Sequence, residues 1–164
     1  MKSIFFKTLL LANLFFIYNC NAQTTNDYIA FYNDVVPKLN SIIPNKTQFY
    51  GQNFSSFYNE LVNKNITIRD ISVDTKTDPG IKYYILRLYF SDNDMEALAS
   101  NNSFRYPWIS ITFQDEIPSQ IKNIILQYHG EWNNTFAQFF SNLKIESIRF
   151  LGINGYNSTD YSEK

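Results

Sequence analysis

The chain has a single cysteine and a single histidine among its 164 residues, Cys20 and His129. One cysteine cannot form an intramolecular disulfide, and the disulfide frameworks of small secreted domains need at least two. Structural zinc sites are built from Cys and His ligands in numbers that this chain does not have. The sequence therefore excludes a disulfide framework, a structural zinc site and a histidine-rich metal centre. We expect no cofactor and no metal.

An excess of charge of one sign is also missing. The 14 Lys and Arg residues are balanced by 15 Asp and Glu residues, which gives a net charge of −1 and a pI near 5.8. Nucleic-acid-binding domains carry a strongly basic surface, so this balance excludes nucleic acid as a partner. Hydrophobic residues make up 45% of the chain, which is enough for a packed core. The length, with no internal repeat, predicts one domain.

Residues 1–22 are typical of a secretory signal peptide. Two lysines carry the only charges of this segment, and an uncharged apolar run follows at residues 8–18. The run suffices for the core of a signal peptide and is shorter than the roughly 20 residues of a membrane-spanning helix. Small residues at Cys20 and Ala22 fit the −3 and −1 positions of a signal-peptidase site. We therefore expect an exported protein, periplasmic or secreted, that begins at Gln23 and has no transmembrane span.

Cys20 offers an alternative to soluble export. In bacterial lipoproteins the chain is cleaved just before a cysteine that follows the apolar run, and that cysteine carries the lipid anchor. The segment Ile17-Tyr18-Asn19 matches such a site only in part, because Asn19 stands where Gly, Ala or Ser is favoured. Cleavage after Ala22 is the favoured prediction, and a protein anchored to a membrane through a lipid on Cys20 is the alternative.

Apolar residues recur at helical spacing in five segments after the signal peptide. These segments cover residues 25–43, 53–62, 91–99, 118–130 and 132–143. Pro37 predicts a kink or a break in the first of them. Asn53 and the run of polar residues at 91–94 are typical of helix starts, and Gly130 is typical of a helix end.

Between the helical segments, the pattern favours strands at residues 66–73, 81–90, 104–113 and 145–151. The alternation slips at Arg69-Asp70, which predicts a bulge, and Pro107 predicts a strand start or a sheet edge. Asp78-Pro79-Gly80 predicts the turn of a hairpin between the first two strands.

The order of these elements predicts an α+β domain over residues 23–164. We expect an antiparallel sheet of about four strands with helices packed on one or both faces, because consecutive strands joined by a hairpin favour antiparallel pairing. The residues from Gly152 onward are polar, and we expect them to form a loose tail.

Candidates for catalysis or metal binding are few. His129 precedes the Gly130 helix end, where a cationic side chain stabilises the helix dipole, and this role is favoured over that of a catalytic base paired with Glu131. Asp92, Asp94 and Glu96 alternate as in the opening of a calcium loop. The required glycine at the sixth loop position and glutamate at the twelfth are missing, so helix capping is the favoured explanation of these acids.

The segment 81–90 has an unusual second face. Leu86 and Leu88 mark the face that we expect in the core, and the opposite face carries Tyr83, Ile85, Arg87 and Tyr89. Aromatic residues with arginine are typical of binding surfaces. Tyr106 and Trp108 continue the pattern on the third predicted strand. These six residues are the predicted binding site, unless helices cover both faces of the sheet.

No sequence motif names an activity. The export signal, the size, the mild acidity and the lack of catalytic motifs favour a small binding protein, of the inhibitor or immunity type, that occludes a protein partner. A glycan is the alternative ligand, bound by a carbohydrate-binding module with an aromatic sheet face. A small hydrolase that acts on envelope polymers through carboxylates is the alternative from another class, and two acids converging in a cleft would favour it.

Overall fold

A computed structural model describes residues 23–77 and 82–164 of the chain. The predicted signal peptide with Cys20, the predicted turn at Asp78-Pro79-Gly80, and Ile81 lie outside these residues. The helices are α2 (Thr25–Ile42), the 3-10 helix η1 (Ile43–Phe49), α3 (Phe54–Asn63), α4 (Asn93–Asn101), α5 (Ile121–Tyr128) and α6 (Asn134–Phe140). The strands are β1 (Asp70–Thr75), β2 (Tyr83–Tyr89), β3 (Trp108–Ile117) and β4 (Ile145–Leu151). Within the described ranges, no helix combines the length and the apolarity that crossing a membrane requires.

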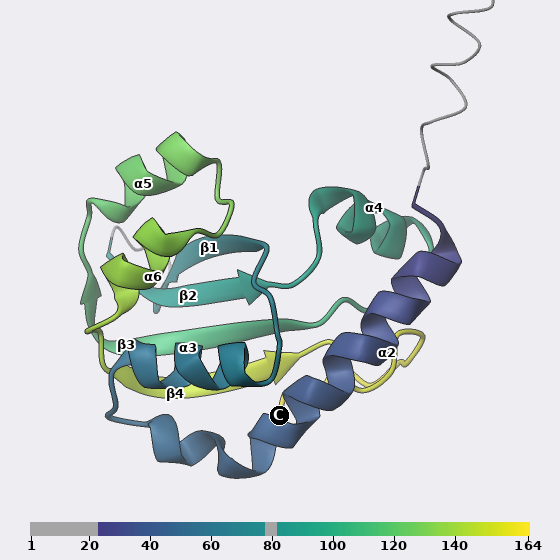
Figure 1. Cartoon of the computed structure of the whole chain (residues 1–164), viewed down its shortest axis with the longest axis horizontal. Helices are drawn as coiled ribbons and strands as arrows, with labels where there is room; N and C mark the ends of the chain where they lie inside the picture. Colours follow the sequence, from purple (N-terminus) through teal and green to yellow (C-terminus); the bar gives the residue numbers. More distant parts are fainter. Residues whose placement is uncertain (1–22, 78–81) are drawn as a thin grey trace, which may run out of the picture.

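The strands form one antiparallel sheet in the order β1-β2-β3-β4, which confirms the predicted α+β fold. In Figure 1, α3 and α6 lie over one face of the sheet, and α2 crosses beside one end of it. Burial alternates along β2: Leu86 and Leu88 are fully buried, whereas Arg87 and Tyr89 between and beyond them are half-buried. Of the two predicted arrangements, the structure therefore has the helices on one face of the sheet.

The core lies between this face and the helices. Aromatic side chains dominate it, because the chain is rich in phenylalanine and poor in alanine. Its largest fully buried members are Tyr28, Phe54, Phe57, Phe113, Phe136, Phe140 and Phe150. Each ring of this size removes more apolar area from water than an aliphatic side chain does.

Helix α2 has no break at Pro37, where the sequence predicted a kink or a break. A capping box between Thr24 and Asp27 starts the helix, and the helix continues through Pro37 to Ile42. Proline removes one hydrogen bond from a helix interior, which costs about 3 kcal/mol. Apolar side chains on both sides of it, among them Val36 and Leu39, are buried in the core, and this burial offsets the cost.

Two predicted strands are shifted in the structure. The predicted bulge at Arg69-Asp70 is instead the beginning of β1, and the register shift against β2 lies between Asp74 and Thr75. The third strand begins directly after Pro107, as the proline predicted, so the aromatic segment before it is no strand. Phe104 in that segment stacks on Tyr28 of α2 with ring centroids 5.7 Å apart. A local pattern cannot distinguish this helix contact from strand pairing.

The residues after β4 are ordered, although their polarity predicted a loose tail. The backbones of Phe150 and Lys164 exchange two hydrogen bonds of 3.0 Å. The Nε of Arg105 donates to the carbonyl oxygen of Ser158 at 3.0 Å, and Ile153 is buried. The tail thereby supplies backbone partners to the edge of β4, which an edge strand otherwise lacks.

Candidate functional site

The first candidate surface is the sheet face that lies opposite the helix layer. We call it the outer face and define it by Ile85, Arg87, Tyr89 and Trp108, all half-buried. Tyr89 and Trp108 are cross-strand partners, and their rings stack with centroids 6.1 Å apart. Ser110, which is buried, is the partner of Arg87 on β3, and its short side chain leaves room for the guanidinium group. The outer face thus combines two stacked rings with an arginine.

Two contacts hold Arg87 in place. Its Nη2 forms an ion pair with the carboxylate of Asp74, and its guanidinium carbon lies 5.4 Å from the centroid of the Trp108 ring. Its Nε is buried and has no hydrogen-bond acceptor among the residues that the structure describes. Since buried donors are normally paired, this placement costs free energy. Costs of this kind are typical of side chains that serve recognition.

One predicted binding residue, Tyr83, lies apart from the outer face, and another, Tyr106, lies outside the strands but lines a cavity of about 260 Å³ together with Trp108. The register shift between Tyr83 and Ile85 reverses the side of the sheet to which Tyr83 points, so Tyr83 packs against the core opposite the buried Ile117. The Nζ of Lys122 on α5 lies 5.3 Å from its ring. Tyr106 precedes β3 and also packs against the core. Burial raises the pKa of the Tyr106 hydroxyl, and the charge of Glu96 adds to the effect.

His129 and the acids of the predicted calcium-loop pattern have structural positions. His129 is exposed and ends α5 in the left-handed backbone conformation, with φ at 55°. Asp92 caps α4 by accepting a hydrogen bond of 2.9 Å from the backbone nitrogen of Met95. Over residues 23–77 and 82–164, no group of three or more His, Cys, Asp or Glu side chains is arranged to hold a metal ion.

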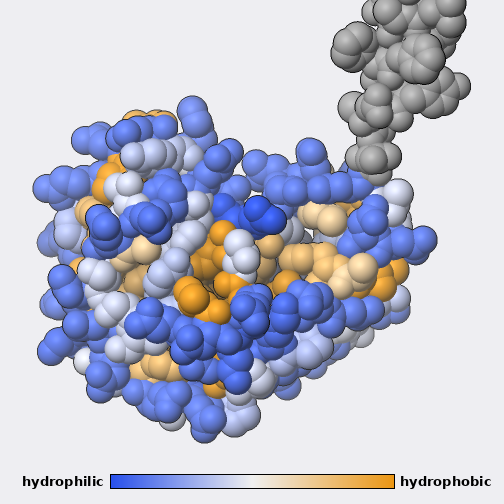
Figure 2. Space-filling model, viewed as in Figure 1, coloured by the Kyte–Doolittle hydropathy of each residue, from blue (hydrophilic) through white to orange (hydrophobic). Residues whose placement is uncertain are grey.

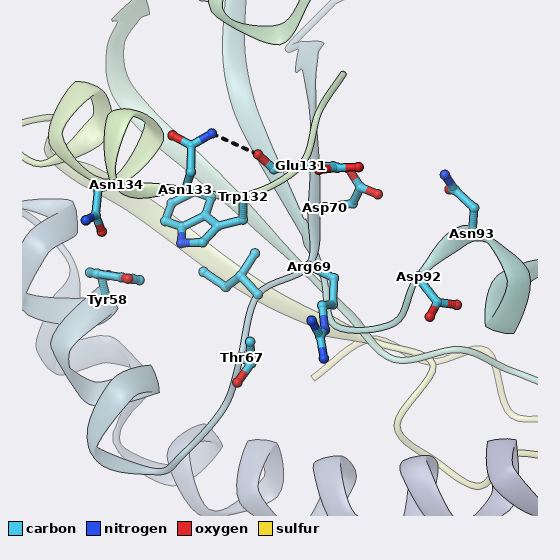
Figure 3. A pocket seen from close by; sticks show the side chains of 11 residues that line it. Tyr58, Thr67, Arg69, Asp70, Asp92, Asn93, Glu131, Trp132, Asn133 and Asn134 are labelled. Atoms are coloured by element: carbon cyan, nitrogen blue, oxygen red, sulfur yellow. Dashed lines mark hydrogen bonds between the residues drawn. The ribbon is translucent and has the colours of Figure 1, made fainter. Parts of the chain in front are cut away.

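The structure also contains a cavity of about 570 Å³ that the sequence analysis did not predict (Figure 3). It lies where β1 begins, between α3, α4 and α6. Its polar lining consists of Thr67, Arg69, Asp70, Asp92, Asn93, Glu131, Asn133 and Asn134. Tyr58 and Trp132 form an aromatic wall with ring centroids 5.5 Å apart. Figure 3 shows these rings on one side of residues 67–70, and Asp92 on the other.

Two acids face each other at this cavity. Asp70 of β1 and Glu131 form an isolated antiparallel bridge, with hydrogen bonds from Ile71 N to the Gly130 oxygen and from Trp132 N to the Arg69 oxygen. In such a non-hydrogen-bonded pair the two side chains lie on the same face, with Cβ atoms about 4.5–5.5 Å apart. Carboxylates placed directly opposite each other repel, which destabilises the fold.

The pKa values around this pair follow from burial and like charge. Burial raises the pKa of the Asp70 carboxyl, and the charge of Glu131 raises it further. Burial, with Asp70 and Asp92 nearby, raises the pKa of Glu96 to about 6. Asp92 is the exception, because the backbone nitrogen of Met95 stabilises its charged form and lowers its pKa. When folding raises the pKa of a carboxyl, the free energy of unfolding falls as the pH rises from the pKa in the unfolded chain to the pKa in the folded protein.

This cavity could not be predicted from the sequence. Asp70 and Glu131 are far apart in the chain, and nothing near either residue marks it as half of a pair. Trp132 was predicted only as part of the apolar stripe of a helix, but it precedes α6 and contacts Phe54 in the core. The one signal was the break in alternation at Arg69-Asp70, which marks the place where β1 begins.

Comparisons with protein-family models, with curated proteins and with solved structures find no match to this chain.

Proposed function

We propose that this chain is an exported binding protein of the inhibitor or immunity type, which occludes a protein partner through the outer face. The observation that supports this proposal best is the open side of the sheet. The helices pack on one face, and the other presents the stacked rings of Tyr89 and Trp108 beside Arg87. Tyr, Trp and Arg are the residue types that dominate the free energy of protein interfaces.

The charges on this side of the sheet indicate what kind of partner fits. Arg87 is paired with Asp74, and Arg149 of β4 with Glu163 at 3.3 Å. Because both arginines are already paired with acids of the same chain, the outer face has no strong charge of one sign. Shape, aromatic contact and the planar donors of Arg87 would then supply the affinity. This suits a protein surface with exposed apolar side chains and carbonyl oxygens.

Arg87→Ala is expected to weaken partner binding by about 2 kcal/mol, because Arg87 is central on the outer face and its donors are planar and held in place. The free energy of unfolding is expected to fall by less than about 1 kcal/mol, since the pair with Asp74 is partly exposed to water. The partner is first identified by capture on the mature protein from its own cells. Binding of the purified partner is then titrated calorimetrically, and unfolding is measured in urea.

Lys38→Ala is the matched control for this experiment. Lys38 also forms an ion pair, with Asp34 at 2.6 Å, but it lies on α2 and not on the outer face. Binding should be unchanged in this variant. If Arg87→Ala binds the partner as tightly as the unaltered protein does, the outer face is not the binding surface.

Export is the second part of the proposal, and it is supported by the lysines, apolar run and small residues of positions 1–22. Residues 1–23 fused to a reporter that is active only outside the cytoplasm are expected to give activity. A reporter that stays inactive in the cytoplasm would contradict export. The intact mass of the natural protein then distinguishes a chain that begins at Gln23 from one that begins at lipidated Cys20.

The other functions predicted from the sequence give different results in the same experiments. A carbohydrate-binding module would bind soluble glycans through Tyr89 and Trp108, and these glycans would compete with any captured protein. The facing carboxylates of Asp70 and Glu131 favour a carboxylate hydrolase as the second candidate. That enzyme would degrade an envelope polysaccharide and lose all turnover in Glu131→Gln, whereas Arg87→Ala would remain active.

A further inference from the structure

The cavity at the start of β1 is one part of a longer groove. A second cavity of about 310 Å³ shares Tyr58, Thr67, Ile68 and Trp132 with it. Both volumes lie within the range of known ligand sites, which measure about 300–1,000 Å³. We call the two cavities together the groove. It crosses residues 67–70 and has the aromatic wall of Tyr58 and Trp132 near its middle.

One half of the groove carries its aliphatic side chains. The second cavity is lined by Val62, Ile66 and Ile68 in addition to the aromatic wall, and by the polar residues Asn65 and Thr67. Val62 is 51% exposed, which is unusual for a valine beside a packed core. Figure 2 shows hydrophobic residues at the centre of the face in view and toward its right-hand end, among hydrophilic ones. Apolar surface of this kind at a concave site is typical of ligand binding.

The other half of the groove is acidic. Asp70, Asp92 and Glu131 line it, and Arg69 is the one basic residue among the lining side chains. The facing pair of Asp70 and Glu131 costs free energy in the free protein, and a cation placed between the two carboxylates would remove that cost. Charge complementarity therefore selects a ligand with a positive group at this end and an apolar group at the other.

We propose that the groove binds an extended peptide segment whose basic side chain lies between Asp70 and Glu131 and whose apolar side chains contact Tyr58, Trp132 and Val62. The amide side chains of Asn93 and Asn134 in the lining can pair with the peptide backbone. A neutral oligosaccharide would use the aromatic wall and the amides equally well. It would leave the repulsion between the facing acids in place, so the charges favour a basic peptide.

The test uses mature protein, residues 23–164, and fluorescent acetylated tetrapeptide amides that carry two leucines, one phenylalanine and one lysine in varied order. At least one order is expected to bind, and the same peptide with glutamate in place of lysine is not. Asp70→Asn is expected to weaken binding about tenfold or more, because it removes one of the two charge-assisted contacts. The same variant should unfold at a higher temperature in the absence of peptide, because the facing charges no longer repel.

Glu96→Gln is the matched control. Glu96 adds to the negative charge near Asp70 but is not among the lining residues of the groove. This variant should also unfold at a higher temperature at pH 7, yet its affinity for the peptide should change by less than about threefold. Only Asp70→Asn should both bind the peptide more weakly and unfold at a higher temperature. A purely structural role of Asp70 would not produce this combination.

Three results would overturn the inference. They are no binding of any lysine peptide at millimolar concentration, equal binding of the lysine and glutamate peptides, and binding of a neutral oligosaccharide that Asp70→Asn leaves intact. The inference does not depend on the proposed function. Arg87→Ala changes the outer face and leaves every lining residue of the groove in place, so peptide binding should survive it even where partner binding is lost.

Discussion

Replacing Phe54 by alanine is expected to lower the free energy of unfolding by about 3–5 kcal/mol. Phe54 is fully buried, and its ring lies within 6.2 Å, centroid to centroid, of four other aromatic rings. Those rings belong to Tyr58, Phe113, Trp132 and Phe140. Four large neighbours that are fixed on α3, α6, the sheet and the segment before α6 cannot close over the vacated volume, so a cavity remains. Unfolding in urea measures the loss.

The same substitution should also affect the groove, because Phe54 supports both rings of its aromatic wall. Leu126→Ala is the control, since Leu126 on α5 is 74% exposed. That variant should change the free energy of unfolding by no more than about 0.5 kcal/mol. A loss below about 1 kcal/mol in Phe54→Ala would mean that the helix layer does not pack on the sheet as described.

Gly152→Ala is expected to cost about 3 kcal/mol or more and to leave little folded protein at 37 °C. Gly152 has φ at +67°, a conformation that costs about 1–2 kcal/mol for residues with a side chain. A Cβ at this position would also overlap the backbone carbonyl of Tyr106, which immediately precedes Pro107 and the start of β3. Backbone cannot rotate away as a side chain can, so β4 and the entry to β3 would have to separate.

Gly51→Ala separates the two contributions. Gly51 has φ at +74°, close to that of Gly152, but no atom lies within 4 Å of a Cβ built on it. Gly51→Ala should therefore lower the free energy of unfolding only by the backbone contribution, about 1 kcal/mol. Urea unfolding of both variants gives the comparison. If they lose equal stability, the close approach of Gly152 to Tyr106 is not an important constraint on the fold.

Much of the architecture could be predicted because its signals are local. The helical spacing of Phe54, Phe57 and Leu61 gave α3, and all three are buried. The alternation along β2 predicted Leu86 and Leu88 in the core, where they are. Periodicity of this kind depends on neighbours within two turns of helix or one length of strand, so it is readable without the fold.

The binding surfaces could be predicted only in part. Arg87 and Tyr89 were expected together from the same alternation, and the pairing of β2 with β3 brings Trp108 beside them. Tyr83 was expected with them and lies on the other side, because the register shift before Ile85 is produced by pairing with β3. A register shift of one residue moves every side chain beyond it to the opposite face of the sheet. The sequence of the strand itself does not indicate such a shift.

The sequence by itself determined the α+β class, the positions of most helices and strands, and the lack of disulfides and Cys/His metal centres. Each of these follows from composition or from spacing within one element. Only the tertiary structure decided that the helices cover one face of the sheet, that the tail pairs with β4, and that Asp70 meets Glu131. These are contacts between segments distant in the chain, and they depend on how the whole core packs rather than on any local preference.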